Sequence, residues 1–270
     1  MSPPSSPPFA KGGSLGAALF YARCAVADLL PITRIPAHGL PKLALVCGDP
    51  KRAERISREL DESELVASNR EYVTYRGRWR NTELLAASHG VGAPGAMIAF
   101  QELARAGVTT MIRAGTCGAL RDDIADGDLI VATAAVRDDG ISDQMVPPTY
   151  PAAATPEVVL ALERACAEAG ARCHRGLVWT KSLFYPGVVT PPHDLLVKAR
   201  VIALEMELSA LLVLGSMLDL RTGGLLVVDG NPSRRASAFD YDPHRPVVDE
   251  AVRKSIRIAL NAAELLATGT

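Results

Sequence analysis

Three short segments of the chain hold the residue types that could do chemistry. Residues 48–52 (GDPKR) and residues 113–118 (RAGTCG) each place an arginine beside glycines. Such segments hold small dianions such as phosphate. Residues 205–207 (EME) place two carboxylates two residues apart, within reach of a polyol such as ribose. Together the three segments predict an enzyme that brings a phosphate and a sugar together.

Residues 48–52 follow the apolar run 43–47, which predicts a buried strand that ends at Gly48. Pro50 suits the first turn of a following helix, and the free N–H groups of a helix N-terminus attract an anion. Arg52 adds a guanidinium group, a planar cation whose N–H donors match a phosphate. The alternative is an ordinary strand–turn–helix with a solvated arginine. For this segment alone the alternative is the better interpretation, because short glycine motifs are weak signals.

In residues 113–118 the arginine closes an expected apolar strand, 109–113, and enters a glycine turn. A charge at that point is costly unless it is paired or bound to a ligand. Thr116 offers a hydroxyl donor in the same turn. The alternative is a structural salt bridge from Arg113 to an internal carboxylate. We favour an anion site here, more firmly when the segment is combined with Gly48.

The segment Glu205, Met206 and Glu207 follows an apolar run and precedes an apolar helix. Alternation would put both glutamates on one side of an extended segment. Two carboxylates on one side repel each other unless they share a donor-rich ligand, and ribose hydroxyls are such a ligand. The alternative is a helix N-terminus enriched in acids, which explains one glutamate better than both.

Asp229 ends the apolar run 225–228 and is followed by Gly230. A carboxylate at a buried strand end can act as a general acid when desolvation raises its pKa. An aspartate before a glycine also suits a simple turn. The residues alone leave these two interpretations equal.

Segments typical of strands and helices alternate from residue 40 onward, which predicts a single α/β domain with a mixed central β-sheet flanked by helices. Ligands collect at strand ends in such sheets, where the chemical segments lie. Residues 1–39 are expected to form an N-terminal extension that is partly disordered, with a helix near 15–30. The expected strands are 43–47, 72–75, 83–88, 109–113, 128–135, 177–180, 201–204 and 224–228, and the expected helices are 50–60, 96–106, 156–169, 208–218 and 247–268.

Composition excludes several classes of protein. The formal net charge of −1 argues against a nucleic-acid partner, and no stretch reaches the ~18–20 apolar residues that span a membrane. The five cysteines form no CxxC pair, which argues against a zinc site. Free thiols fit a reducing, cytoplasmic setting. We expect no metal and no organic cofactor, with phosphate as a co-substrate.

Seven ordered motifs from about residue 40 onward resemble the hexameric-type nucleoside phosphorylases, the purine nucleoside and uridine phosphorylases. Several motifs in order are far more specific than any one of them. They are GDPxR at 48–52, NREY at 69–72, SHGVG at 88–92, RAGTCG at 113–118, FYPG at 184–187, EMEL at 205–208 and VDGNP at 228–232.

The resemblance implies the nucleoside phosphorylase fold and a phosphate site formed by Gly48, Arg52, Arg113 and Thr116. It also implies that Arg70 reaches into the site of a neighbouring subunit, in a dimer from which a hexamer is built. Further implied residues fall into two groups. The ribose site would use Glu205, Met206 and Glu207, and the base site would use Cys117, Gly118, Phe184 and Tyr185.

The resemblance also bears on which base is removed. Uridine phosphorylases carry a Gln-x-Arg pair just after the FYPG-type motif, where this chain has Val188 and Thr190. Purine enzymes use an aspartate to protonate N7 of the leaving base, and Asp229 occupies that place. VDGNP also looks like the pattern of apicomplexan-type purine nucleoside phosphorylases. We therefore expect reversible phosphorolysis of 6-oxopurine nucleosides, with uridine phosphorolysis as an alternative.

One departure concerns the 5′ end of the ribose. The family usually has a histidine about 16–18 residues before the GDP motif, where this chain has Leu30, Pro31 and Ile32. His38 is closer to the motif and would need a different path. A 5′-deoxy or 5′-methylthio nucleoside is therefore a further alternative substrate.

Overall fold

The computed structural model describes residues 28–185, 187–234 and 241–269. Its strands form one mixed sheet of ten strands, in the order β10-β6-β8-β9-β5-β1-β4-β3-β2 with β7 beside β6. The strands are β1 (Leu43–Cys47), β2 (Asp61–Asn69), β3 (Tyr72–Trp79), β4 (Thr82–Ser88), β5 (Thr110–Ala119), β6 (Leu129–Asp138), β7 (Ala152–Ala153), β8 (Cys173–Lys181), β9 (Ala203–Glu205) and β10 (Arg221–Gly230).

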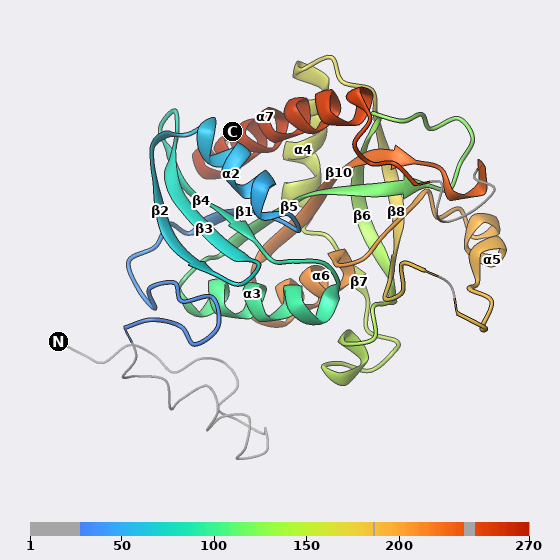
Figure 1. Cartoon of the computed structure of the whole chain (residues 1–270), viewed down its shortest axis with the longest axis horizontal. Helices are drawn as coiled ribbons and strands as arrows, with labels where there is room; N and C mark the ends of the chain where they lie inside the picture. The colour runs from blue at the N-terminus through green and yellow to red at the C-terminus, as the bar shows by residue number, and fades with distance from the viewer. Residues whose placement is uncertain (1–27, 186, 235–240, 270) are drawn as a thin grey trace.

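Helices cover both faces of this sheet, as the α/β alternation predicts. Helices α4 and α7 pack together on one face and α3 and α6 on the other (Figure 1). The helices are α2 (Pro50–Arg58), α3 (Ala93–Arg105), α4 (Pro156–Glu168), α5 (His193–Lys198), α6 (Leu208–Leu218) and α7 (Pro246–Thr268), with short 3-10 turns η2 (Ser142–Gln144) and η3 (Pro232–Arg234).

Part of the sheet closes on itself. Strand β10 pairs with both β5 and β6, so β5, β10, β6, β8 and β9 form a ring. Strands β1, β4, β3 and β2 extend from β5, and β2 is the outer edge. The core between sheet and helices is built mainly of Ala, Val, Leu and Ile. The predicted single α/β fold is therefore confirmed.

Two predicted turns are strands in the structure. Residues 113–118, expected as a glycine turn after a strand, lie inside β5. Gly115 is required by close packing, since a Cβ there would meet the Arg113 guanidinium and Leu226 at 2.8 Å. Asp229 and Gly230 likewise belong to a strand, as the last two residues of β10, so the Asp-Gly turn is not formed. Strand β2 and helix α5 were not predicted.

Residues 28–39, within the expected N-terminal extension, pack on the domain. Leu30 and Ile35 are buried. The N–H and hydroxyl of Thr33 donate to the buried carboxylate of Glu102 on α3 (2.7 and 2.6 Å). The expected disorder near the N-terminus and most of the expected helix at 15–30 lie outside the described residues. Within the described part of the chain, no helix is long and apolar enough to cross a membrane.

Candidate active site

One edge of β5 is only partly paired, and a pocket lies along it. On one side β10 pairs with β5 from Thr110 to Gly118. On the other side the pairing with β1 ends at Arg113 and the pairing with β9 begins at Gly118. Residues 114–117 therefore have no partner strand there, and their backbone groups are available to side chains and ligands. The Arg52 guanidinium donates to the Ala114 carbonyl in this gap (3.2 Å).

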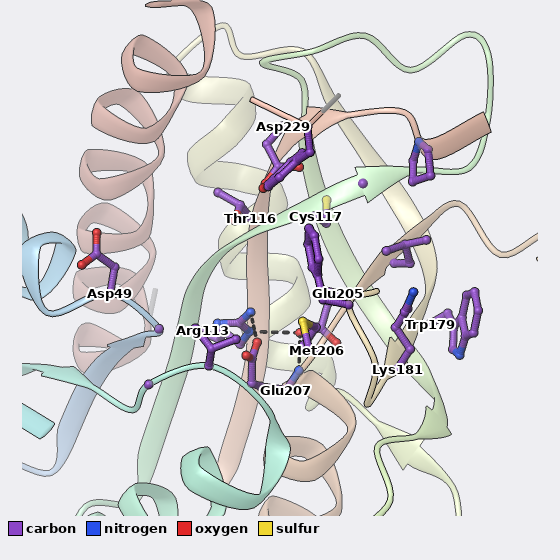
Figure 2. A pocket seen from close by; sticks show the side chains of 18 of the residues that line it. Asp49, Arg113, Thr116, Cys117, Trp179, Lys181, Glu205, Met206, Glu207 and Asp229 are labelled. Atoms are coloured by element: carbon purple, nitrogen blue, oxygen red, sulfur yellow. Dashed lines mark hydrogen bonds and ion pairs between the residues drawn. The ribbon is translucent and has the colours of Figure 1, made fainter. Parts of the chain in front are cut away.

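The pocket beside this gap has a volume of about 860 Å³, large enough for a nucleoside and an anion. Figure 2 shows several of the predicted side chains converging on it from different strands. The sequence-predicted residues that line it are Gly48, Arg52, Arg113, Thr116, Cys117, Gly118, Phe184, Glu205, Met206, Glu207 and Asp229.

The GDPKR segment forms the strand–turn–helix that the sequence predicts. Asp49 is the N-cap of α2, and its carboxylate accepts the N–H of Lys51 (2.9 Å). Gly48 must be small, because a Cβ there would lie 3.1 Å from the Gly90 carbonyl oxygen. Burial lowers the pKa of Arg52, and the nearby charge of Arg113 lowers it further. Two arginines are thus held near each other at one end of the pocket, where an anion would relieve their repulsion.

Arg113 is buried between the two glutamates. Its Nε donates to Glu205 (3.2 Å) and its Nη2 to Glu207 (2.5 Å). Their charges raise the pKa of Arg113 against the opposing effect of burial. The salt-bridge alternative is therefore realised, and the role of Arg113 as a phosphate ligand stays a prediction.

The two glutamates have different surroundings. Glu205 ends β9 and accepts the N–H groups of Glu207 and Leu208 at the start of α6 (each 2.9 Å), as well as the Thr180 hydroxyl. Glu207 accepts from Arg113 and from the Gly92 N–H (2.6 Å). Burial raises the pKa of Glu207, and the Arg113 charge opposes that rise. Glu205 is thus a helix-capping carboxylate, and Glu207 has fewer protein donors and is the better placed to accept ligand hydroxyls.

His89 is fully buried beside Arg113 and has a defined tautomer. Its Nε2 lies 3.2 Å from Nη1 of Arg113, which can only donate, and its Nδ1 lies 2.9 Å from the Gly90 carbonyl, which can only accept. The ring is therefore neutral, with the proton on Nδ1. Burial, then the Arg113 charge, lower the pKa of His89 well below its usual value.

We expect the His89 ring to stay neutral between about pH 5 and 8, the range in which an ordinary histidine changes charge. Nitrogen-15 NMR of labelled protein would follow Nδ1 and Nε2, with His89→Gln identifying the signals and free imidazole in the same tube as reference. A His89 signal that moves with the imidazole would show that the ring gains a proton.

Asp229 enters the pocket because of a β-bulge. In the β10–β5 pairing Val228 lies opposite Cys117 and Gly230 opposite Gly118, so Asp229 is the extra residue. Bulges re-aim side chains and are frequent beside active sites. Asp229 is 4% exposed, and its Oδ2 accepts the hydroxyl of Tyr241 (2.6 Å). In Figure 2 it lies above Thr116 and Cys117.

Of the two aromatic residues predicted for the base site, only one lines the pocket. Phe184 lines the pocket, and Tyr185 packs edge-on against it with ring centroids 4.9 Å apart but is not a lining residue. Tyr241 packs on Phe184 at 5.3 Å. Burial raises the pKa of the Cys117 thiol well above its usual value, so this side chain stays a neutral thiol.

Arg70 does not line the pocket of its own chain. It lies in the turn between β2 and β3, with an exposed side chain and a φ of 54°. Its contact with a neighbouring subunit's site stays a prediction.

Sequence reasoning missed twelve lining residues. Glu71 lies in the NREY motif, Gly90 and Val91 lie in SHGVG, and Asp49 and Pro50 lie in GDPxR, so those motifs could have indicated them. Pro232 lies in VDGNP and could have been indicated in the same way. The others lie outside the quoted motifs, and folding brings them together: Trp179, Lys181, Pro191, His193, Leu204 and Tyr241. Among the described residues, no cluster of His, Cys, Asp and Glu could hold a metal ion.

The chain is similar to nucleoside phosphorylases over most of its length. Residues 42–265 match the model of the phosphorylase superfamily. The purine nucleoside phosphorylase of Plasmodium falciparum is 33% identical, with 89% of this chain and 98% of that protein covered. The uridine phosphorylase of Treponema pallidum is 35% identical, covering 87% and 93%. The crystal structure of the Toxoplasma gondii purine nucleoside phosphorylase with immucillin-H has a TM-score of 0.86 at 31% identity, covering 90% and 98%.

The chain therefore belongs to the phosphorylase superfamily, and the resemblance drawn from its motifs is confirmed. Within that family it is a nucleoside phosphorylase, a pentosyltransferase that acts on a nucleoside and phosphate. The relatives divide between purine and uridine enzymes, so the choice of base has to be argued from the site.

Proposed function

We propose that this protein catalyses the reversible phosphorolysis of 6-oxopurine nucleosides, giving the free base and ribose 1-phosphate. The observation that carries the proposal is the bulge that aims Asp229 into the pocket that also holds Arg52, Arg113 and Glu207. A purine leaves readily only when its N7 gains a proton, and a buried carboxyl group can supply one. Uracil has no N7, and Val188, at the first place of the uracil-reading pair, is fully exposed.

In the proposed reaction the bond from C1′ to the base loosens first, and positive charge develops on the sugar. The phosphate dianion stabilises that charge and then forms the new bond to C1′. Arg52, Arg113 and the backbone of the Gly48 turn position the dianion, with Thr116 as a hydroxyl donor. Glu207 accepts from the ribose hydroxyls, and Met206 packs against the sugar. Phosphate is a co-substrate, and we propose no metal or organic cofactor.

We also propose a dimer in which Arg70 of each subunit completes the other subunit's phosphate site, with three dimers in a hexamer. Support comes from the exposed position of Arg70 on the β2–β3 turn, where it does not line the pocket of its own chain. A cytoplasmic location remains our expectation, supported by the four described cysteines, which are all free thiols.

The test is release of free base from inosine, uridine and 5′-methylthioadenosine, each with and without phosphate. Phosphate-dependent release of hypoxanthine, with little from the other two, is the expected result. Phosphate-dependent cleavage of uridine or 5′-methylthioadenosine instead would support one of the alternative substrates. Release that needs no phosphate would contradict the proposal, because the arginines would then have no anion to hold.

A further inference from the structure

A cation lies at the end of the pocket away from the two arginines. Lys181 is the last residue of β8 and lines the pocket. Its neighbour Thr180 pairs with Glu205 of β9, and β9 separates β8 from β5 in the sheet. Figure 2 shows Lys181 beside Trp179, on the side of Met206 away from Arg113. The pocket thus has basic side chains at both ends, with the glutamates of residues 205–207 between them.

The ammonium of Lys181 is held by an aromatic ring. Its Nζ lies 5.6 Å from the centroid of the Trp179 ring, within the range of a cation–π contact. The ring is buried and fixed, because its Nε1 donates to Asp138 (3.1 Å). Burial lowers the pKa of Lys181, and the Asp138 charge opposes that effect. The lysine is therefore pre-positioned and partly desolvated.

No acceptor within the described part of the chain makes a hydrogen bond or an ion pair with the Lys181 ammonium. An ammonium has three donors, and a partly buried charge is stabilised by an acceptor. The other pocket cations differ in this respect, since Arg113 has two carboxylates and Arg52 has the Ala114 carbonyl. Ligand binding would supply what Lys181 lacks.

The order of groups along the pocket indicates which part of the ligand Lys181 meets. A nucleoside whose sugar lies at Glu207 and faces a phosphate near Arg52 has its base at the opposite end. Figure 2 places Lys181 and Trp179 at that end, and Phe184 also lines the pocket, so a cation and aromatic rings are present for a flat heterocycle.

We propose that Lys181 is a specificity-determining residue whose ammonium donates a hydrogen bond to a carbonyl oxygen of the bound base. This inference rests on the proposed function, and it adds the residue that separates oxopurines from aminopurines. An exocyclic amino group is a donor, so adenine would place a donor against a donor and leave the ammonium without an acceptor. A site built to bond a substrate group discriminates strongly against an analogue without it.

The test compares Lys181→Met, which keeps the length of the side chain, with Lys198→Met, which removes the same charge from the exposed end of α5. For Lys181→Met, kcat/KM for inosine should fall by about 10- to 100-fold, the range for a hydrogen bond to a charged group. The value for adenosine should change by less than about threefold. Lys181→Arg should recover part of the loss, and Lys198→Met should match the parent on both substrates.

Two further measurements distinguish this proposal from the alternative roles of Lys181. Calorimetry of hypoxanthine and adenine binding, in the presence of phosphate, should show that Lys181→Met weakens only hypoxanthine. This measurement needs no turnover, so it tests Lys181 even if the parent enzyme fails to cleave inosine, which would count against the proposed function alone. An equal loss on inosine and adenosine would overturn the base-reading role. So would a loss on inosine that disappears with 5′-deoxyinosine, because Lys181 would then read the 5′ oxygen.

Discussion

Replacing Asp229 with asparagine is expected to lower kcat for inosine phosphorolysis by about 10²- to 10⁴-fold, the usual contribution of a positioned general acid. The KM for phosphate should change little, because the predicted phosphate residues lie in the Gly48 turn, on α2 and on β5, whereas Asp229 lies on β10. Asparagine keeps the shape of the side chain and can still bond the hydroxyl of Tyr241, but it cannot donate a proton to the leaving base. Steady-state kinetics with varied inosine and varied phosphate separate the two effects.

The matched control for Asp229→Asn is a substrate that needs no proton. The base of 7-methylguanosine already carries a positive charge at N7, so its departure does not depend on an acid. The variant should therefore cleave 7-methylguanosine within about tenfold of the parent rate while losing most of its activity on inosine. An equal loss on both substrates would assign Asp229 to binding or structure instead of proton transfer.

Much of this arrangement could be predicted from local sequence. The run LALVC before Gly48 correctly predicts both ends of β1, and helix α6 also has the expected ends. Strand β1 is wholly apolar and α6 is mostly apolar, so the local signal and the final burial agree. Gly48 directly follows β1 and Glu207 directly precedes α6, so correct element ends also place these predicted site residues correctly, at the strand ends where ligands bind.

The errors share a physical cause, which is that a packing or pairing contact, not the local pattern of residues, decides the structure. Glycines in residues 113–118 suggested a turn, but Gly115 is needed where Arg113 and Leu226 pack against it. Strand β2 (DESELVASN) has little apolar alternation and is held by its pairing with β3. Lys181 gains its place from the pairing of β8 with β9, for which no local pattern exists.

Replacing Arg113 with methionine is expected to lower the free energy of unfolding by about 3–5 kcal/mol at neutral pH, as removal of one partner of a buried ion pair does. The side chains of the cluster, Arg113, Glu205 and Glu207, are at most 5% exposed. Without the guanidinium, two neighbouring carboxylates would face each other with no cation. Urea unfolding measures the change, and Arg55→Met is the control. Arg55 has an exposed ion pair with Asp249, which should contribute at most about 1 kcal/mol.

The deficit of Arg113→Met should depend on pH with a defined sign. Burial already holds the pKa of Glu207 above its usual 4.5 in the folded protein, and the Arg113 charge limits that rise. Removing Arg113 raises the pKa further, so the folded variant binds a proton that the unfolded chain releases. The stability from this proton is fully present below the unfolded pKa of 4.5. It is lost as the pH rises through the raised pKa of the folded variant. The variant should therefore approach the parent as the pH falls from neutrality toward 4.5, and a deficit that does not depend on pH would contradict this account.

The effect of phosphate on stability tests whether Arg113 also binds the substrate phosphate. A ligand that binds only the folded state stabilises it in proportion to the logarithm of its concentration above the dissociation constant. The parent should therefore gain stability as phosphate is raised at constant ionic strength. The double variant Arg113→Met/Glu207→Gln removes one unpaired charge and should regain part of the stability, so that phosphate can be tested on a folded chain. If that double variant gains as much from phosphate as the parent does, Arg113 only holds the glutamates, and Arg52 with the Gly48 turn accounts for the anion site.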